Sequence, residues 1–280
     1  MKPSHPRALL TLGLLLVVGA CGVTQSPGPA TALPAASGAA RLPATLADPR
    51  RSGYLDMSPA LQAMQHDATQ HPGLLWVADG AALWSHAPAS GPACAGCHGA
   101  GAADTLRDVA ARYPAWDAGL ARPVDLGQRI NLCRERHQRA APWTFESQEL
   151  LALESYVAHA ARGLPVTPPD DPRLLPYRVR GEALHRQRLG QLDLSCAQCH
   201  DERAGGRLGG SVIPQGRSVG YPTYRLEWQG LGSLQRRLRN CMTGVRAEPF
   251  AYGSTQMIEL ELYLAWRDRG MGMETPSVRP

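Results

Sequence analysis

Two copies of one short motif carry the residues of this sequence that are best suited to chemistry. Each copy reads Cys-x-x-Cys-His, in which the two thiols can take up the vinyl groups of a haem as thioethers and the histidine can bind its iron. The sequence therefore predicts two covalently bound haem c groups, with His98 and His200 as proximal iron ligands. The two motifs are Cys94-Ala-Gly-Cys97-His98 and Cys196-Ala-Gln-Cys199-His200.

One further cysteine follows each motif, Cys133 in the first half and Cys241 in the second. Because these cysteines stand at almost equivalent places in the two halves, we expect both to bind haem iron as thiolates on the distal side. The alternatives are two buried free thiols or a disulfide between them. The other distal candidates are His137 and His159 in the first half, and Met242, Met257, Met271 and Met273 in the second.

Arginines gather in the sequence just before Cys241. Arg237 precedes this cysteine by four residues and shares its face if the segment is helical. Positive charge there would stabilise a thiolate and bind a small dianion through charge-assisted hydrogen bonds. We therefore expect Cys241 and Arg237 to be catalytic, with Arg237 and Arg246 binding the substrate. We expect Arg236 and Arg239 to pair with haem propionates or with acidic side chains.

The two halves of the chain repeat one plan. Gly80-Ala-Ala-Leu83 precedes the first motif much as Gly181-Glu-Ala-Leu184 precedes the second, and residues 151–158 align with residues 258–265. Their apolar residues recur at helical spacing. Such a duplication predicts a mainly α protein of two tandem class I cytochrome c-like domains, each with one covalently bound haem c. We also expect a helix over residues 104–112.

The first 48 residues read as export and tether sequence. Residues 1–20 combine a positive start with a short apolar run, as in a signal peptide. The run ends at Val18-Gly19-Ala20-Cys21, which resembles a lipobox, so Cys21 is a candidate lipid anchor; the alternative is an ordinary secretory signal. Residues 21–48 are rich in Pro, Ala and Ser and predict a flexible tether. We expect a periplasmic protein, tethered to the membrane if Cys21 is lipidated.

The domain boundary falls in a proline-rich linker over residues 164–172. It separates an N-terminal cytochrome c domain, residues 49–165, from a C-terminal one, residues 173–280, which carries the active-site haem. The formal charge of +5 comes from arginines spread over most of the chain without an aromatic stacking pattern. We therefore expect no binding to nucleic acid.

The stretch from Tyr224 to Glu248 closely resembles the SoxA subunits of the sulfur-oxidising SoxAX cytochrome complexes, and Gln62-Ala-Met-Gln and Pro72-Gly-Leu-Leu-Trp-Val add to the likeness. The resemblance covers the chain after the tether. It implies an L-cysteine S-thiosulfotransferase that couples thiosulfate oxidatively to a cysteine of a SoxYZ-type sulfur-carrier protein. A SoxX-type monohaem cytochrome c would be its heterodimer partner and take up the electrons.

The resemblance also implies roles for single residues. Cys241 matches the persulfidated cysteine that is the distal ligand of the active-site haem, and Arg237 matches the substrate-binding arginine. Two Cys-x-x-Cys-His motifs indicate the two-haem form of the family, while the lipobox-like leader departs from a soluble periplasmic subunit. Two other functions stay open: a thiosulfate dehydrogenase that forms tetrathionate, and a plain electron-transfer dihaem cytochrome.

Overall fold

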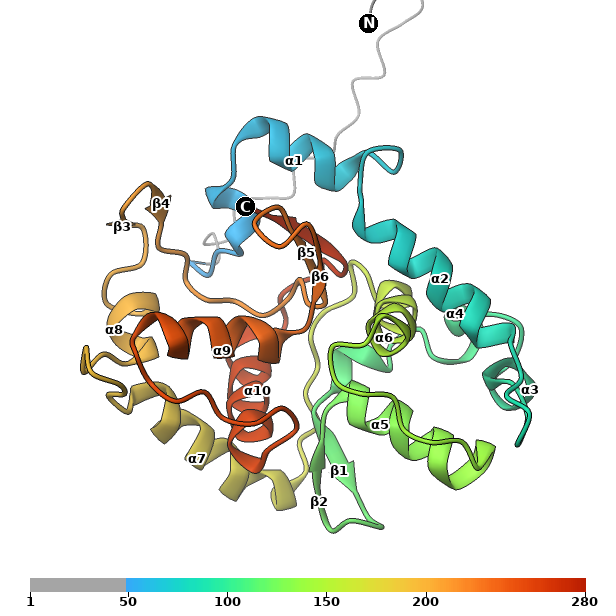
Figure 1. The fold of residues 1–280 in the computed structure, drawn as a ribbon. Helices are drawn as coiled ribbons and strands as arrows, with labels where there is room; N and C mark the ends of the chain where they lie inside the picture. Colours follow the sequence, from blue (N-terminus) through green and yellow to red (C-terminus); the bar gives the residue numbers. More distant parts are fainter. Residues whose placement is uncertain (1–48) are drawn as a thin grey trace, which may run out of the picture. The chain divides into compact units, whose positions relative to one another are not determined.

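Helices dominate the structure of residues 49–280, which are the residues that the computed structural model describes (Figure 1). The predicted mainly α class is confirmed. The segments for which a signal peptide, a tether and a lipid anchor at Cys21 are predicted lie outside the described residues. Within residues 49–280, no helix combines the length and the apolar character needed to cross a membrane.

Local capping signals set the helix ends in the first half. The Ser58 hydroxyl accepts a hydrogen bond from the Leu61 amide, and the Ser147 hydroxyl does the same for Leu150. Gly163, with φ +81°, follows the last helix. The elements are η1 (Gly53–Asp56), α1 (Pro59–His66), α2 (Gly73–Ser85), α3 (Cys94–His98), α4 (Ala102–Thr105), η2 (Ala110–Arg112), β1 (Ala115–Asp117), β2 (Arg122–Val124), α5 (Leu126–Cys133), η3 (Arg134–Gln138) and α6 (Gln148–Ala160).

The helix predicted over residues 104–112 is wrong. The chain forms α4, leaves helical geometry at Leu106 (φ −119°, ψ 18°), and turns again only in η2. Two polar contacts hold α4 against other parts of the fold. The Tyr156 hydroxyl accepts from the Ala102 amide, which has no intrahelical partner at the helix start, and the Thr105 hydroxyl donates to the His98 carbonyl at the end of α3.

The second half repeats the main elements of the first in the same order. In each half a motif helix, a short antiparallel hairpin and a helix ending at or just beyond the lone cysteine follow one another. Asp117 lies opposite Arg122 in the first hairpin, and Arg225 lies opposite Gly230 in the second. The elements are η4 (Pro172–Leu174), α7 (Leu175–Arg186), α8 (Cys196–His200), β3 (Arg207–Leu208), β4 (Ser211–Val212), β5 (Thr223–Arg225), β6 (Gly230–Gly232), α9 (Leu234–Gly244), α10 (Thr255–Asp268) and β7 (Ser277–Arg279).

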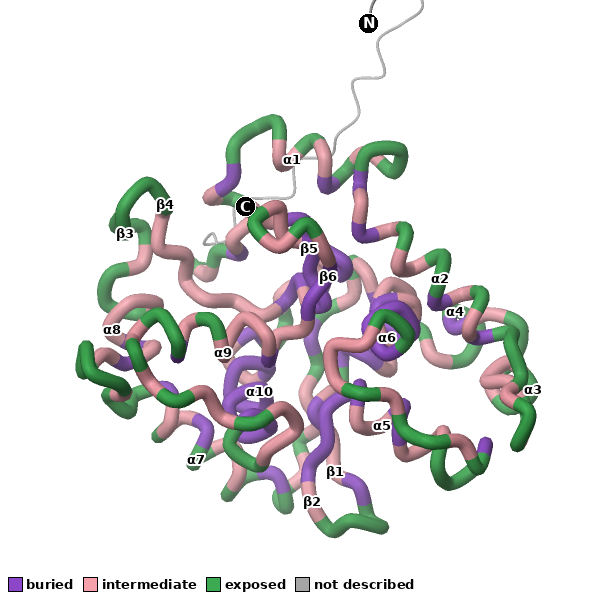
Figure 2. Tube along the Cα trace, viewed as in Figure 1, coloured by how far each residue is buried: buried purple, intermediate pink, exposed green. Residues whose placement is uncertain are grey.

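Each half is built on one close pair of helices, α2 with α6 and α7 with α10. A Cβ atom on Gly80 would lie 2.2 Å from the Ala152 carbonyl oxygen, and one on Gly181 would lie 1.9 Å from that of Glu259. Only glycine lets the paired backbones approach this closely. α6 and α10 are the most deeply buried helices of their halves (Figure 2). These matching pairs confirm the two tandem cytochrome c-like units.

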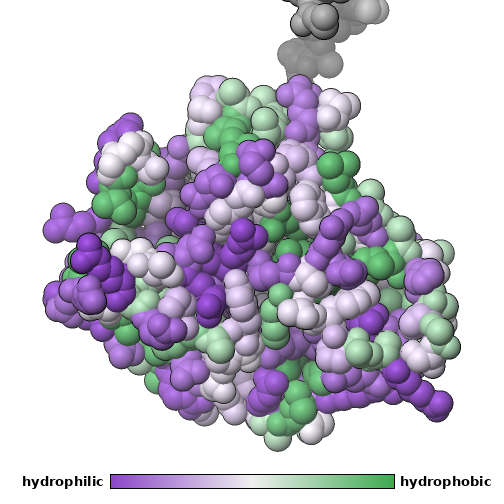
Figure 3. Space-filling model, viewed as in Figure 1, coloured by the Kyte–Doolittle hydropathy of each residue, from purple (hydrophilic) through white to green (hydrophobic). Residues whose placement is uncertain are grey.

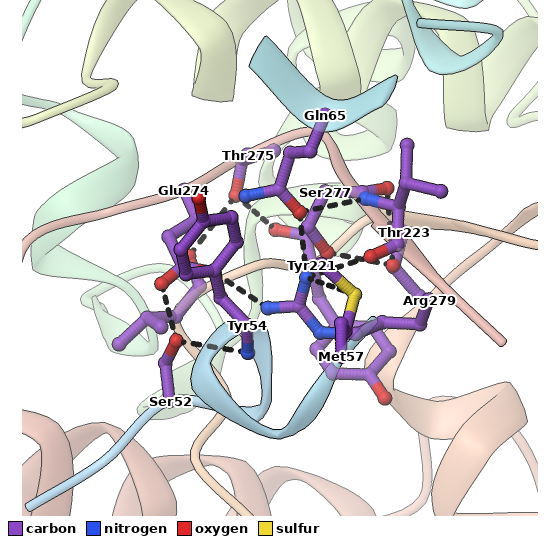
Figure 4. A network of polar contacts seen from close by, with 12 residues as sticks. Ser52, Tyr54, Met57, Gln65, Tyr221, Thr223, Glu274, Thr275, Ser277 and Arg279 are labelled. Atoms are coloured by element: carbon purple, nitrogen blue, oxygen red, sulfur yellow. Dashed lines mark hydrogen bonds and ion pairs between the residues drawn. The ribbon is translucent and has the colours of Figure 1, made fainter. Parts of the chain in front are cut away.

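The last strand, β7, ties the end of the described chain to both its start and its second half. β7 pairs in parallel with β5, which is also antiparallel to β6. The Gln65 side chain of α1 accepts from the Val278 amide at 3.0 Å and from Arg279 Nη1 at 2.6 Å, and Thr223 and Ser277 share a hydroxyl hydrogen bond of 2.7 Å (Figure 4). This buried network fixes the position of β5.

Candidate functional site

A cavity of about 380 Å³ lies in the first half, bounded by α2, α3, α5 and α6. Cys94, Cys97, His98 and Cys133 all line it, so the predicted attachment cysteines and both predicted iron ligands face one space. The rest of the wall is largely apolar. An apolar cavity with two thiols and an imidazole fits a covalently bound haem. The apolar lining includes Trp84, Leu106, Val109, Leu126, Ile130, Leu153 and Val157.

The structure separates the distal candidates of the first half. Cys133 and His137 line the cavity, but His137 is exposed on the π-helical turn η3. His159 instead places Nδ1 3.4 Å from the Thr275 carbonyl oxygen. Burial raises the pKa of the Cys133 thiol although Arg129 and Arg136 act to lower it. The first cavity therefore does not favour a free thiolate at Cys133.

Arg129, four residues before Cys133, is paired with a buried carboxylate. Its Nη1 atom lies 2.8 Å from Asp117 Oδ2. Arg136 donates to both oxygens of the same carboxylate, at 2.9 and 3.0 Å. These hydrogen bonds hold the pKa of Asp117 well below its usual range, and the Asp117 side chain is only 2% exposed. Asp117 thus neutralises the arginine that faces the first distal cysteine.

In the second half, α8 places Cys196, Cys199 and His200 within one helical turn of one another. The helix starts at Ser195, which forms a capping box with Gln198. His200 Nδ1 donates to the Pro214 carbonyl oxygen at 2.7 Å. This bond orients the ring and leaves Nε2 for a metal, as expected of a proximal haem ligand. The second motif therefore also fits a covalently attached haem.

α9 brings Cys241 against His200, and the thiol and the imidazole lie within hydrogen-bonding reach. Burial acts to raise the pKa of the Cys241 thiol. The hydrogen bond with His200 and the positive charges of Arg237 and Arg225 outweigh burial, so the pKa is lowered. Cys241 is thus held toward the thiolate form, in contrast to Cys133.

The methionine candidates belong to the hydrophobic cores. Met242 and Met257 are 4% and 0% exposed and pack with Leu260. Met273 is part of another buried cluster, and Met271 packs against it. None of the six cysteines within residues 49–280 forms a disulfide, so the bridge between Cys133 and Cys241 is excluded. Among the second-half candidates, Cys241 is the one placed against His200.

The arginines near Cys241 differ in whether their charge acts on its sulfur. Arg237 lies on α9 with Cys241, and Arg225 reaches the site from β5. Arg246 follows the end of α9 and is exposed, while the charges that lower the pKa of Cys241 come from Arg237, His200 and Arg225. On the face of the molecule that carries α9, hydrophilic side chains cover much of the surface (Figure 3).

Arg236 and Arg239 are used within the fold. Arg236 Nη1 lies 4.0 Å from Glu146 Oε2, as expected for pairing with an acidic side chain. Arg239 donates instead to the Phe250 carbonyl, and its guanidinium lies 4.6 Å from the centre of the Tyr252 ring. Both arginines therefore act on neighbouring protein groups.

Sequence reasoning missed Arg225 and the nearby Glu227. A signal was available, because the register that aligns Cys133 with Cys241 also aligns Arg129 with Arg237 and Asp117 with Arg225. Extending this alignment through the two hairpins would have shown that the acidic Asp117 of the first half is replaced by the basic Arg225 in the second.

Comparisons with known proteins agree with this geometry. The family model "SoxA/TsdA, cytochrome c domain" matches residues 79–166 and 180–273. The chain is 36% identical over 230 residues to the L-cysteine S-thiosulfotransferase subunit SoxA of Pseudaminobacter salicylatoxidans, covering 81% of this chain and 80% of that protein. It is 35% identical over 243 residues to the subunit of the same name from Rhodovulum sulfidophilum, covering 85% and 84%.

A solved structure shows the same similarity in three dimensions. The crystal structure of SoxXA from P. pantotrophus superposes with a TM-score of 0.79 at 30% sequence identity, covering 82% of this chain and 87% of the other. The matched cytochrome c model implies covalently bound haem c in this chain, in agreement with its motifs and cavity. The chain belongs to the SoxA family of c-type cytochromes.

Proposed function

We propose that this chain is the SoxA-type subunit of an L-cysteine S-thiosulfotransferase. It holds two haem c groups, one on each Cys-x-x-Cys-His motif. His98 and Cys133 would hold the first haem iron, and His200 and Cys241 would hold the second. A bound haem c supplies a one-electron redox centre beside the distal cysteine. Support comes from the convergence of these side chains in each half.

One observation carries the catalytic assignment: α9 places Cys241 one turn from Arg237 and facing His200. Arg237, with Arg246 in support, binds the thiosulfate dianion. The Cys241 sulfur forms a bond to the outer sulfur of thiosulfate, and the two electrons that this oxidation releases pass singly to two oxidised partner cytochromes, because a monohaem cytochrome accepts one electron. The thiolate of the carrier cysteine then attacks that same sulfur, which forms the carrier cysteine S-thiosulfonate and restores the Cys241 thiolate.

The partners follow from the same assignment. A SoxX-type monohaem cytochrome c forms the heterodimer and takes up electrons, and a SoxYZ-type protein carries the cysteine that is modified. The structural similarity to SoxXA supports the first partner. The leader supports export to the periplasm, with Cys21 as a lipid anchor. The proposed haem domains comprise residues 49–165 and 173–280.

The function is tested by incubating the purified protein and its cytochrome partner with thiosulfate, with and without the carrier protein. We expect the carrier cysteine to gain a thiosulfonate group, detected by mass spectrometry, together with reduction of the cytochrome. Tetrathionate formation at an undiminished rate without the carrier would instead identify a thiosulfate dehydrogenase. In the persulfidated form of Cys241 that the family resemblance implies, the same steps start from the outer persulfide sulfur and restore it. Mass spectrometry of the Cys241 peptide tests this form, because one added sulfur atom adds about 32 Da.

A further inference from the structure

Two guanidinium groups converge beside Cys241, and one carboxylate stands between them. Glu227 Oε1 lies 2.8 Å from Arg225 Nε and 3.7 Å from Arg237 Nη1. The two arginines repel each other electrostatically, and both act on the Cys241 sulfur. An anion between two like charges offsets their repulsion. In this structure Glu227 is that anion.

The carboxylate and its two partners differ in how firmly they are held. The Arg225 side chain is 12% exposed and that of Arg237 is 32% exposed, whereas that of Glu227 is 46% exposed. Arg225 Nε is buried without a hydrogen-bond acceptor, because its close contact with Glu227 is not aligned for a hydrogen bond. A half-exposed ion pair of this kind contributes little to stability. Glu227 can therefore leave while the arginines stay in place.

Arg225 is positioned by the sheet rather than by Glu227. Its strand, β5, is paired on both sides, with Gly230 of β6 and Arg279 of β7 as the residues opposite Arg225. The network around Thr223 and Ser277 secures the same strand (Figure 4). The guanidinium also lies 5.3 Å from the centre of the Trp228 ring. Removing the carboxylate therefore leaves Arg225 pointing at the same place.

In the equivalent site of the first half, around Cys133, the arginines that act on the cysteine are already paired with a carboxylate and are not free to bind an anion. There the residue equivalent to Arg225 is Asp117, whose buried carboxylate bonds to Arg129 and Arg136. Asp117 is 2% exposed and cannot swing into solvent as Glu227 can. The same position of the repeat is thus Asp117 in the first half, where the carboxylate neutralises the neighbouring arginines, and Arg225 in the second half, where the arginines remain open to an anion.

We infer that Arg225 is the second anion-binding residue of the Cys241 site, that it binds a dianion together with Arg237, and that Glu227 is an internal competitor which the dianion displaces. A dianion satisfies two guanidinium groups better than one carboxylate oxygen does. The inference rests on the proposed function for the identity of the dianion, thiosulfate. It explains why an anionic substrate is directed to the second half of a duplicated protein.

The test measures anion binding to the haem-loaded protein by calorimetric titration with thiosulfate and, separately, with sulfate as a dianion that does not react. Arg225→Gln is expected to weaken the binding of both anions about tenfold to a hundredfold, as for the loss of a charged hydrogen-bond donor. Glu227→Gln is expected to tighten both about twofold to fivefold. Arg207→Gln and Glu202→Gln, at exposed positions of the same half, are matched controls for general charge effects.

Each outcome decides a part of the inference. Unchanged affinity in Arg225→Gln would overturn the second binding residue, and unchanged or weaker affinity in Glu227→Gln would overturn the competitor. Effects of equal size in the controls would overturn both. An unaltered haem absorption spectrum shows that each variant is folded. If the expected affinities are found but no carrier modification occurs, the anion site stands and the proposed transfer reaction fails.

Discussion

Arg237 and Cys241 lie one turn apart on the same face of α9, and the charge of the arginine acts to lower the pKa of the thiol. Arg237→Gln removes the charge but keeps a polar side chain. We expect kcat/KM for thiosulfate to fall about tenfold to a hundredfold, because a charge-assisted contact with the dianion is lost. Steady-state kinetics with the carrier protein measure the effect.

Arg246, just beyond the C-terminal end of α9, offers a matched comparison. Because its side chain is exposed, its attraction for an anion is screened by solvent and salt. Arg246→Gln should therefore lower kcat/KM by less than about threefold, and less still at high ionic strength. A loss as large as that of Arg237→Gln would show that Arg246 contacts the bound substrate directly.

Cys241→Ala tests the nucleophile without removing the haem. The thioether links at Cys196 and Cys199 remain, so the haem content should be unchanged while the absorption spectrum shifts with the lost axial ligand. Transfer of thiosulfate to the carrier should fall to background. Cys133→Ala is the control in the other half, and it should retain most of the transfer activity while its own haem spectrum changes.

Buried carboxyl groups between the two halves predict a pH-dependent stability. Burial raises the pKa of Asp125 to about 6 and those of Glu154 and Glu261 well above the usual value. An acid with a raised pKa binds its proton more tightly in the folded state, so its contribution to stability is complete below the unfolded pKa, about 4, and is lost as the pH rises through the folded pKa. The contribution of these three carboxyl groups to the free energy of unfolding should therefore decrease from pH 4 to pH 7, whereas His185, whose pKa burial lowers to about 4, contributes an increase over the same range.

Asp125→Asn isolates one of these groups. The amide can still cap α5, where Asp125 accepts a hydrogen bond from the Gln128 amide at 2.6 Å. It cannot titrate, so the decrease between pH 4 and pH 7 should shrink by on the order of 1–3 kcal/mol. Denaturant titrations at several pH values measure this slope. Asp108→Asn, at an exposed position, should leave the slope as it is in the parent protein.

The helix crossings predict opposite effects for two glycine substitutions. Gly181→Ala places a methyl group against the Glu259 carbonyl and should destabilise the protein by about 1–3 kcal/mol, as overpacking does. Gly244→Ala, at the end of α9, meets no atom within 4 Å and should stabilise by about 0.4–1 kcal/mol. Thermal unfolding followed by circular dichroism distinguishes the two. Destabilisation by both would show that helix crossing is not the cause.

Much of the fold and the centre of the site could be predicted from local patterns. The Ser58 and Ser147 caps, the helical spacing of Leu150 and Leu153, and the two haem motifs all act over a few residues, and their elements are where the sequence indicates. The pairing of Arg237 with Cys241 depends on one helical turn, so it could also be predicted from the sequence.

What escaped prediction depends on contacts between distant segments. Arg225 reaches Cys241 because β5 is clamped between β6 and β7, and no local pattern around Arg225 encodes this pairing. The position of the short helix α4 similarly depends on the His98 carbonyl and on Tyr156 of α6. Such contacts override local helix propensity, which is a weak preference.

The anchoring of β7 also determines when the anion site can form during folding. Gln65 bonds to Val278 across 213 residues and Thr223 to Ser277 across 54, so these contacts close long loops. Loop closure costs entropy before the contacts repay it, which slows their formation relative to local helices. α9 can coil early with Arg237 and Cys241 already aligned. Arg225 takes its place only after the last strand has docked, so anion affinity should be among the last properties acquired on the folding pathway.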